Sequence, residues 1–177
     1  GLTQEDLAGL SALCASRGTL HAVSLPESLF AQAPVVRYYS RAMYYRLLAA
    51  QLLPDTLDRV LDLDPDILVI NPLRSLYETD LDGNLMAAAT HSGLLSGISD
   101  PVNRLRLSNY EAEAYFNSGV LVMNLPLMRS QVQPEEIFAY AREHEDILIL
   151  PDQDILNGLY GGRILEVDDS LWNYDAR

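Results

Sequence analysis

The sequence predicts an α/β domain in which a mostly parallel sheet is flanked by helices. Segments with helical spacing of apolar residues alternate along the chain with short apolar runs that are typical of strands. These runs are nearly continuous, as expected for strands covered on both faces, which is the usual situation in a parallel sheet. The chain has 177 residues and shows no linker or internal repeat. We therefore expect a single domain over residues 1–177.

The composition excludes several kinds of partner and chemistry. The formal net charge of −13 at pH 7 argues against nucleic acid or an anionic membrane surface, because both are negatively charged. No apolar run approaches the ~20 residues of a membrane-spanning helix, and residues 1–6 lack the features of a signal peptide. Cys14 is the single cysteine, so an internal disulfide is excluded and a reducing, cytoplasmic location is expected. All 12 basic residues are arginines, which excludes lysine-based chemistry.

The first third of the chain predicts two helices separated by a short strand. Thr3 is expected to cap the first helix and Gly18 to end it, and a strand is expected over residues 20–25. Ser40 is expected to cap the second helix. Arg46 lies in this helix among several tyrosines. Such a cluster would suit a phosphate or a nucleobase; the alternative is ordinary aromatic packing beside a surface arginine.

The stretch from residue 59 to residue 73 is the strongest strand signal in the chain. It is apolar at both ends, and three carboxylates occupy alternate positions in its middle: Asp62, Asp64 and Asp66. Because side chains of a strand alternate between its faces, all three are expected to project to one side. Burying neighbouring unpaired carboxylates costs free energy, so a bound cation or an opening to water is expected there.

Carboxylate oxygens of this kind suit Mg²⁺ or Mn²⁺, and we interpret Asp64-Pro65-Asp66 as a metal-binding Asp-x-Asp motif. A chance occurrence is one alternative, because acidic residues are common in this chain. An EF-hand calcium loop would also place acidic residues at this spacing. That loop needs a turn glycine and a bidentate glutamate where this chain has Ile67 and Leu73. The EF-hand is therefore excluded.

Helices and strands continue to alternate in the second half of the chain. A short helix is expected over residues 73–78. A long loop with room for one helical turn is expected over residues 91–114 and begins with His91, which is either a site residue or a solvated loop histidine. Helices are expected to begin at Pro134 and at Pro151, since proline is favoured at the first helical position. The strands expected in this part lie at residues 85–90, 120–125 and 164–167.

Four separated stretches, taken together, resemble glycosyltransferase family 8, the retaining galactosyl- and glucosyltransferases that include bacterial lipopolysaccharide enzymes and glycogenin. The stretches follow the family's order, at residues 43–47, 59–69, 115–124 and 152–157. The resemblance implies a GT-A fold, which is a Rossmann-like α/β sheet. It also implies a UDP-sugar donor bound through Mn²⁺ or Mg²⁺, and transfer of glucose or galactose with retention at the anomeric carbon.

The resemblance further implies which residues face the nucleotide. Asp64 and Asp66 would ligate the metal, Asp66 most directly, and Asp64 would also contact the ribose. Arg46 would lie near the sugar or the diphosphate of the donor. The metal and the guanidinium would then neutralise the charge that develops on the departing UDP.

Other residues would face the transferred sugar if the resemblance holds. Asn117 would contact the sugar, and Asp152 would bind its hydroxyl groups. Gln153 would lie beneath the anomeric carbon with Asp154 beside it. The catalytic group implied in this way is Asp152, Gln153 and Asp154. Retention through same-face attack and retention through a covalent intermediate, with Gln153 or Asp154 as the nucleophile, both stay open.

The sequence departs from the family pattern at three places. Asp62 stands where the family usually carries an aromatic residue. The family's first strand, which holds uracil and ribose, would precede Gly1. A late stretch with a metal-binding histidine and a diphosphate-binding lysine would follow Arg177. We therefore expect this chain to be the core of a longer enzyme.

Two functions are consistent with these features, and a third is disfavoured by them. The leading hypothesis is a metal-dependent enzyme that moves a hexose from UDP-glucose or UDP-galactose to a glycan, lipid-linked or protein acceptor. The alternative is a catalytically degenerate module of the same fold that binds a sugar nucleotide or another protein. A glycosidase would need two carboxylates flanking a cleft, whereas Asp152 and Asp154 share one helical turn. We expect the full-length protein to be cytoplasmic, with peripheral attachment to a membrane left open.

Overall fold

The computed structural model describes residues 2–36, 39–90, 100–110 and 112–174. The chain divides into two compact units, residues 1–31 and residues 32–177. Each unit is described by itself below. No helix among the described ranges is long and apolar enough to cross a membrane.

The first unit contains one regular helix, α1 (Gln4–Cys14). Thr3 caps α1 as expected: the Asp6 N–H donates to Thr3 Oγ1 at 3.1 Å, and the Thr3 N–H donates to Asp6 Oδ2 at 2.7 Å. The predicted strand over residues 20–25 is wrong, because these residues form no regular structure. A strand is stabilised by pairing with a neighbour, and no described residue pairs with this segment in a sheet. A short 3₁₀ helix, η1 (Glu27–Phe30), follows.

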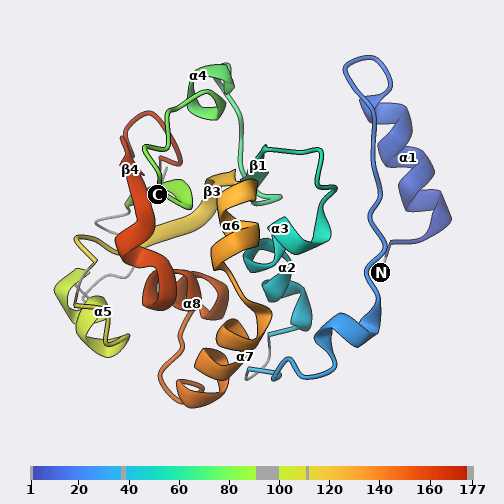
Figure 1. Ribbon diagram of the computed structural model, residues 1–177. Coiled ribbons are helices and arrows are strands. Elements are labelled where there is room, and N and C mark those ends of the chain that lie inside the picture. The colour runs from blue at the N-terminus through green and yellow to red at the C-terminus, as the bar shows by residue number, and fades with distance from the viewer. Residues whose placement is uncertain (1, 37–38, 91–99, 111, 175–177) are drawn as a thin grey trace. The chain divides into compact units, whose positions relative to one another are not determined.

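The second unit is built on a sheet, to which the described part of the chain contributes four strands. They are β1 (Arg59–Leu63), β2 (Met86–Thr90), β3 (Phe116–Asn124) and β4 (Ile164–Val167), in the spatial order β1-β3-β2-β4. β3 lies between β1 and β2 and pairs with both in the antiparallel direction, while β2 and β4 are parallel (Figure 1).

The expectation of a mostly parallel sheet is therefore wrong for these strands, although the α/β fold class is confirmed. The apolar run of β3 reflects its central position, since residues 118–123 are all buried. A continuous apolar run shows that a strand is covered on both faces and does not show the direction of its neighbours. Direction depends on the connections, which the hydrophobic pattern does not encode.

β1 ends earlier than the sequence predicts. Leu63 pairs with Val120, and the Asp64 N–H donates to Gly119 O at 2.9 Å, after which the ladder stops. Pro65 has no N–H to continue it. Beyond the turn, Ile67 packs against the core, whereas Leu68 and Ile70 are 83% and 80% exposed. The strand predicted within the stretch 59–73, ahead of the helix expected from residue 73, is thus confirmed over residues 59–63 and wrong beyond them.

Short helices surround the sheet. The single helix predicted after Ser40 is instead three short segments, η2 (Arg41–Met43), α2 (Tyr44–Leu47) and α3 (Ala49–Leu52). The remaining helices are α4 (Arg74–Tyr77), α5 (Asp100–Arg106), α6 (Leu125–Gln131), α7 (Pro134–Glu143), α8 (Pro151–Tyr160) and η3 (Gly161–Arg163). α7 and α8 begin at the predicted prolines.

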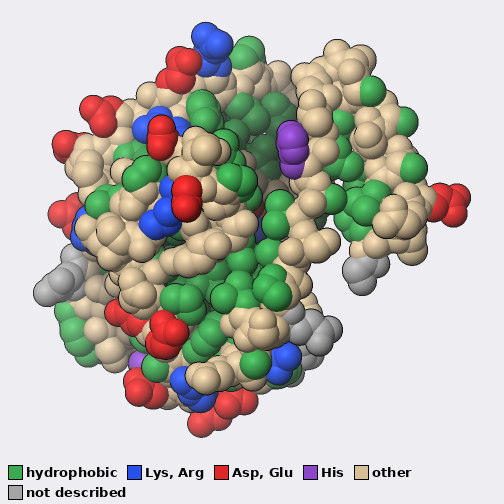
Figure 2. All heavy atoms as spheres, turned by 45° about the vertical axis from the view of Figure 1, so that its right-hand side comes forward, with side chains coloured by type: hydrophobic (Ala, Val, Ile, Leu, Met, Phe, Trp, Pro, Cys, Tyr) green, Lys and Arg blue, Asp and Glu red, His purple; other side chains and the backbone are tan. Residues whose placement is uncertain are grey.

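Packing around β3 positions the functional residues. α8 packs against β3, α7 and α2, while α3 packs against α6 (Figure 1). One face of the sheet contributes Ala87, Val120 and Val122 to a buried cluster with Leu76 and Leu81. On the face of the molecule drawn in Figure 2, acidic and basic side chains lie scattered among hydrophobic ones. Because β3 pairs with β1 and packs against α8, the end of β1, the start of β3 and the first turn of α8 come together.

Candidate active site

Arg46 is the centre of a cluster of charged side chains. Its Nε lies 3.3 Å from Asp62 Oδ2, and its Nη1 lies 3.0 Å from Asp152 Oδ2. Its Nη2 pairs with Asp64 Oδ1. Nη1 also donates to the carbonyl oxygen of Ser118 at 2.9 Å and to Ser118 Oγ at 3.0 Å. A single guanidinium is therefore shared among three carboxylates and one main-chain carbonyl.

The cluster is assembled from four elements. Arg46 lies on α2, Asp62 lies near the end of β1 with Asp64 just after it, Ser118 lies in β3, and Asp152 is the second residue of α8. The Arg46 side chain is 16% exposed, whereas the Asp64 side chain is 35% exposed. The three carboxylates are thus only partly exposed, and the guanidinium among them is covered further.

Burial and charge act against each other in this cluster. Burial raises the pKa of the Asp62 carboxyl, with the charge of Arg46 opposing the rise and the two neighbouring carboxylates adding to it. Burial likewise raises the pKa of Asp152, and Arg46 again opposes this. Burial alone would lower the pKa of Arg46, but its hydrogen bond to Asp64 and the surrounding negative charge outweigh it, so that pKa is raised. Arg46 is therefore a permanent cation.

The two expected metal ligands differ in their surroundings. Asp64 is engaged by Arg46, while Asp66 is exposed in the turn that follows β1. The described residues contain no group of three or more His, Cys, Asp or Glu side chains that could hold a metal ion. Mg²⁺ is commonly bound by one or two carboxylates together with water and substrate phosphates. Two carboxylates would leave a hard divalent ion to take its other ligands from water or a diphosphate, and Asp64 and Asp66 as metal ligands stay a prediction.

Gly119 allows β3 to approach this site closely. A Cβ atom at Gly119 would lie 2.9 Å from Asn117 Oδ1 and 3.1 Å from Asp64 Oδ2. Both distances are shorter than ordinary van der Waals contact. Asn117 Oδ1 already accepts hydrogen bonds from the Gly119 N–H at 2.7 Å and from Asn173 Nδ2 at 2.6 Å. The absence of a side chain at residue 119 thus leaves room for two of the predicted site residues.

Gln153 is held against β3 by its side-chain oxygen. The Ser118 N–H donates to Gln153 Oε1 at 3.0 Å. Asn157, one turn later on α8, donates through Nδ2 to the Phe116 carbonyl at 2.7 Å and accepts from the Phe116 N–H at 2.7 Å. Gln153 is only 6% exposed. These bonds fix the first turns of α8 against the start of β3.

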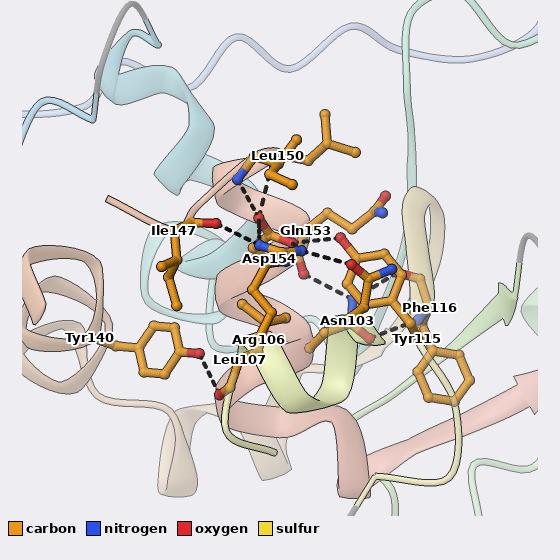
Figure 3. Close-up of polar contacts among 12 residues, drawn as sticks. Asn103, Arg106, Leu107, Tyr115, Phe116, Tyr140, Ile147, Leu150, Gln153 and Asp154 are labelled. Atoms are coloured by element: carbon orange, nitrogen blue, oxygen red, sulfur yellow. Dashed lines mark hydrogen bonds and ion pairs between the residues drawn. The ribbon is translucent and has the colours of Figure 1, made fainter. Parts of the chain in front are cut away.

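Asp154 has a different environment from Asp152. It is fully buried, at 0% exposure. Its carboxylate accepts hydrogen bonds from both Nη atoms of Arg106, from Tyr115 Oη and from two main-chain N–H groups (Figure 3). Burial and the adjacent carboxylate raise the pKa of Tyr115, which therefore stays a hydrogen-bond donor. This placement favours a structural role, and a catalytic role for Asp154 stays a prediction that the geometry does not favour.

The structure thus brings Asp64 and Asp152 into contact with Arg46, while the roles toward metal and donor that the resemblance implies for these residues stay predictions. It adds residues that the sequence analysis did not single out. Ser118 lies within the stretch that carries the family resemblance, whereas Arg106 lies in a segment predicted as loop and had no motif to mark it. His91, the other candidate of that segment, lies outside the described residues.

Comparison with known proteins gives the family. The family described as Glycosyl transferase family 8 matches residues 3–175. The lipopolysaccharide 1,2-glucosyltransferase of Escherichia coli (strain K12) is 32% identical over 137 residues, which cover 75% of this chain and 38% of that protein. The lipopolysaccharide 1,3-galactosyltransferase of Salmonella typhimurium (strain LT2) is 27% identical over 126 residues, covering 70% of this chain and 37% of that protein.

A solved structure extends the likeness to the fold. The galactosyltransferase LgtC, in complex with donor and acceptor sugar analogs, superposes with a TM-score of 0.79 and 29% identity, covering 96% of this chain and 60% of LgtC. The predicted GT-A fold is confirmed by this likeness. The chain spans less than half the length of the two lipopolysaccharide enzymes. On the family match and these relatives, the chain belongs to glycosyltransferase family 8.

Proposed function

We propose that this chain is the donor-binding core of a metal-dependent, retaining enzyme that moves glucose or galactose from a UDP-sugar to a glycan or lipid-linked acceptor. One observation carries the proposal: residues from separate family-like stretches converge on Arg46, namely Asp64 and Asp152. Relatives named as lipopolysaccharide glucosyl- and galactosyltransferases support the hexose and the class of acceptor. LgtC, whose complex holds donor and acceptor sugar analogs, supports a sugar donor and a sugar acceptor.

The nucleotide end of the proposed site combines Asp64, Asp66 and Arg46. A divalent ion bound by the two aspartates would act as a Lewis acid toward the diphosphate. Arg46 supplies a positive charge that stays constant over the working pH range, because its pKa is raised. Such a fixed charge lowers the barrier when it faces the negative charge that develops on the leaving group. The carboxylates around Arg46 hold its guanidinium in one orientation.

The sugar end of the proposed site combines Asn117, Asp152 and Gln153. Asp152 offers a part-exposed carboxylate that can accept hydrogen bonds from sugar hydroxyls. The side-chain oxygen of Asn117 already accepts from two donors, so its amide nitrogen is the atom that we expect to donate to the sugar. The Gln153 oxygen is similarly held by Ser118. We therefore assign the sugar-facing roles to these residues and not to Asp154.

The test is release of UDP from UDP-glucose or UDP-galactose by the full-length protein, with Mn²⁺ and with a chelator. Asp66→Ala removes the exposed carboxylate and is expected to lower the rate by about 10²-fold or more, since one electrostatic contact to the transition state is typically of that magnitude. Asp58→Ala is the matched control, because Asp58 is an exposed aspartate just before β1. Release that survives both the chelator and Asp66→Ala would contradict metal dependence.

A second candidate is a degenerate module that binds a sugar nucleotide without transferring the sugar. The observation that favours it is Asp62, a third carboxylate on Arg46 where the family usually has an aromatic residue. Three carboxylates around one guanidinium leave excess negative charge, which would repel a diphosphate when no cation is bound. Calorimetric titration of UDP with and without Mn²⁺ separates the two candidates. Metal-dependent binding without sugar release supports the module, and binding with release supports the enzyme.

A further inference from the structure

A fork of hydrogen bonds from Arg106 to the buried Asp154 joins α5 to α8. Arg106, the last residue of α5, donates from Nη1 to Asp154 Oδ2 at 2.9 Å and from Nη2 to Asp154 Oδ1 at 2.7 Å. The same two nitrogens also donate to Ile147 O at 2.7 Å and to Asn103 Oδ1 at 3.0 Å (Figure 3). A planar guanidinium matches a carboxylate in this bidentate arrangement, which fixes direction as well as distance.

Asp154 uses its remaining hydrogen-bonding capacity to close the start of α8. Leu150, the residue before the helix, has no polar side chain with which to cap it. Asp154 reaches back from the fourth helical position and accepts from the Ile149 N–H at 2.6 Å and the Leu150 N–H at 3.1 Å. Tyr115 donates to the same carboxylate at 2.6 Å from just before β3. One carboxylate therefore joins α5, the entrance of α8 and the entrance of β3.

Asp152 and Gln153 are the two residues of α8 that we propose to face the sugar, and both lie in the helical turn that Asp154 holds. Asp152 contacts Arg46, and Gln153 accepts from Ser118. Both precede Asp154 directly in the first turn of α8. A reacting group held about 1 Å away from its productive position can lose about 10²-fold in rate. The orientation of this turn is therefore a quantity on which the reaction depends.

We propose that Arg106 is a positioning residue of the glycosyl-transfer site: acting through Asp154, it fixes the first turn of α8 and thereby the orientation of Asp152 and Gln153. This inference rests on the proposed function for its kinetic consequence. Arg106 itself contacts neither the Arg46 cluster nor the exposed Asp66 in any hydrogen bond or ion pair found among the described residues. Its effect should therefore fall on turnover more than on donor binding.

The kinetic test compares Arg106→Gln, Asp154→Asn and the double variant in the full-length protein, assayed well below their melting temperatures. Each single variant is expected to lower kcat by about 10- to 100-fold, with KM for the UDP-sugar changed by less than about threefold. The double variant is expected to be no slower than the worse single variant, because both substitutions break the same hydrogen bonds between Arg106 and Asp154. A kcat for Arg106→Gln within about twofold of wild type, or a double variant with multiplied defects, overturns the proposal.

The matched control is Arg129→Gln. Arg129 on α6 also joins several main-chain carbonyls, those of Ala50, Pro54 and Leu57, and pairs with Asp55 at 3.3 Å. Its loss should lower the melting temperature and leave kcat unchanged. Should Arg106→Gln fail to fold, Arg106→Lys decides: it keeps the charge without the fork, and kcat should still fall. A wild-type kcat in Arg106→Lys then overturns the proposal.

Amide hydrogen exchange tests whether Arg106 holds the first turn of α8 in place, without any assay of sugar transfer. The N–H groups of Ile149 and Leu150 donate to Asp154, so Arg106→Gln should speed their exchange while Arg129→Gln should not. Unchanged exchange in Arg106→Gln overturns the proposal. Absence of UDP release by the wild-type protein would contradict the proposed function instead. The exchange rates would then decide only whether Arg106 holds the first turn of α8.

Discussion

At the scale of single residues, Arg46 determines the character of the site. Its guanidinium is held by three carboxylates and by Ser118, and burial makes each of these contacts stronger than it would be in water. The same burial raises the pKa of Asp62 and of Asp152, so the cluster carries unfavourable charge at neutral pH. The site is thus less stable than its number of ion pairs suggests, which is common at functional sites.

Asp62→Asn should therefore stabilise the protein at neutral pH. Because the folded-state pKa of Asp62 is raised, folding takes up protons, and stability is lost as pH rises through that pKa. Removing the charge should raise the free energy of unfolding at pH 7 by an amount on the order of 1 kcal/mol, while Arg46 keeps its other two partners. Thermal melts at several pH values check this. The gain should shrink as pH falls through the raised pKa and vanish below the unfolded-state pKa of aspartate, about 3.9, and a gain that persists below about pH 3 contradicts the explanation.

Gly119→Ala should impair the site more than the fold. The added Cβ meets the ends of two side chains, Asn117 Oδ1 and Asp64 Oδ2, which can move aside at a cost of about 1 kcal/mol, the low end of the usual range for an added methyl group. Both would then leave their functional positions, so UDP release should fall by about 10-fold or more. Gly9→Ala is the control, since a Cβ at Gly9 in α1 meets nothing within 4 Å. Equal effects of the two substitutions on UDP release would contradict this account.

At the scale of elements, the sequence predicts where some helices begin better than it predicts how strands pair. Capping by Thr3 and the initial prolines of α7 and α8 are local signals, and each helix begins where its signal lies. The direction and extent of strands depend on partners that are distant in sequence. The segment over residues 20–25 has an apolar pattern without a partner, so it forms no strand.

The same distinction applies to the candidate site. Arg46, Asp64 and Asp152 could be identified because each lies in a stretch that resembles the family. Arg106 could not, because it carries no motif and its importance depends on a carboxylate distant in sequence. Asp154 shows that a position beside candidate residues in the sequence does not place a side chain in the site: it follows Asp152 and Gln153, yet it is fully buried and bonded to Arg106.

At the scale of the whole molecule, the net negative charge of the chain and the carboxylates around Arg46 both favour the binding of a cation. The chain carries a net charge of −13, and the Arg46 cluster adds local repulsion among carboxylates. A cation that binds the folded form and not the unfolded form stabilises the protein by mass action. Divalent ions should therefore act on stability as well as on the proposed reaction.

Mn²⁺ is expected to raise the melting temperature of the full-length protein. At about 100 times its dissociation constant, a ligand that binds only the folded state adds about 2.7 kcal/mol to the free energy of unfolding. Non-specific screening of the negative charge would also stabilise, but it would act equally in Asp66→Ala and in the control Asp58→Ala. Melting curves of both variants over a range of Mn²⁺ concentrations distinguish the two effects. A shift that survives Asp66→Ala unchanged would show that the ion acts on overall charge, and Asp66 would then lose its assignment as a metal ligand.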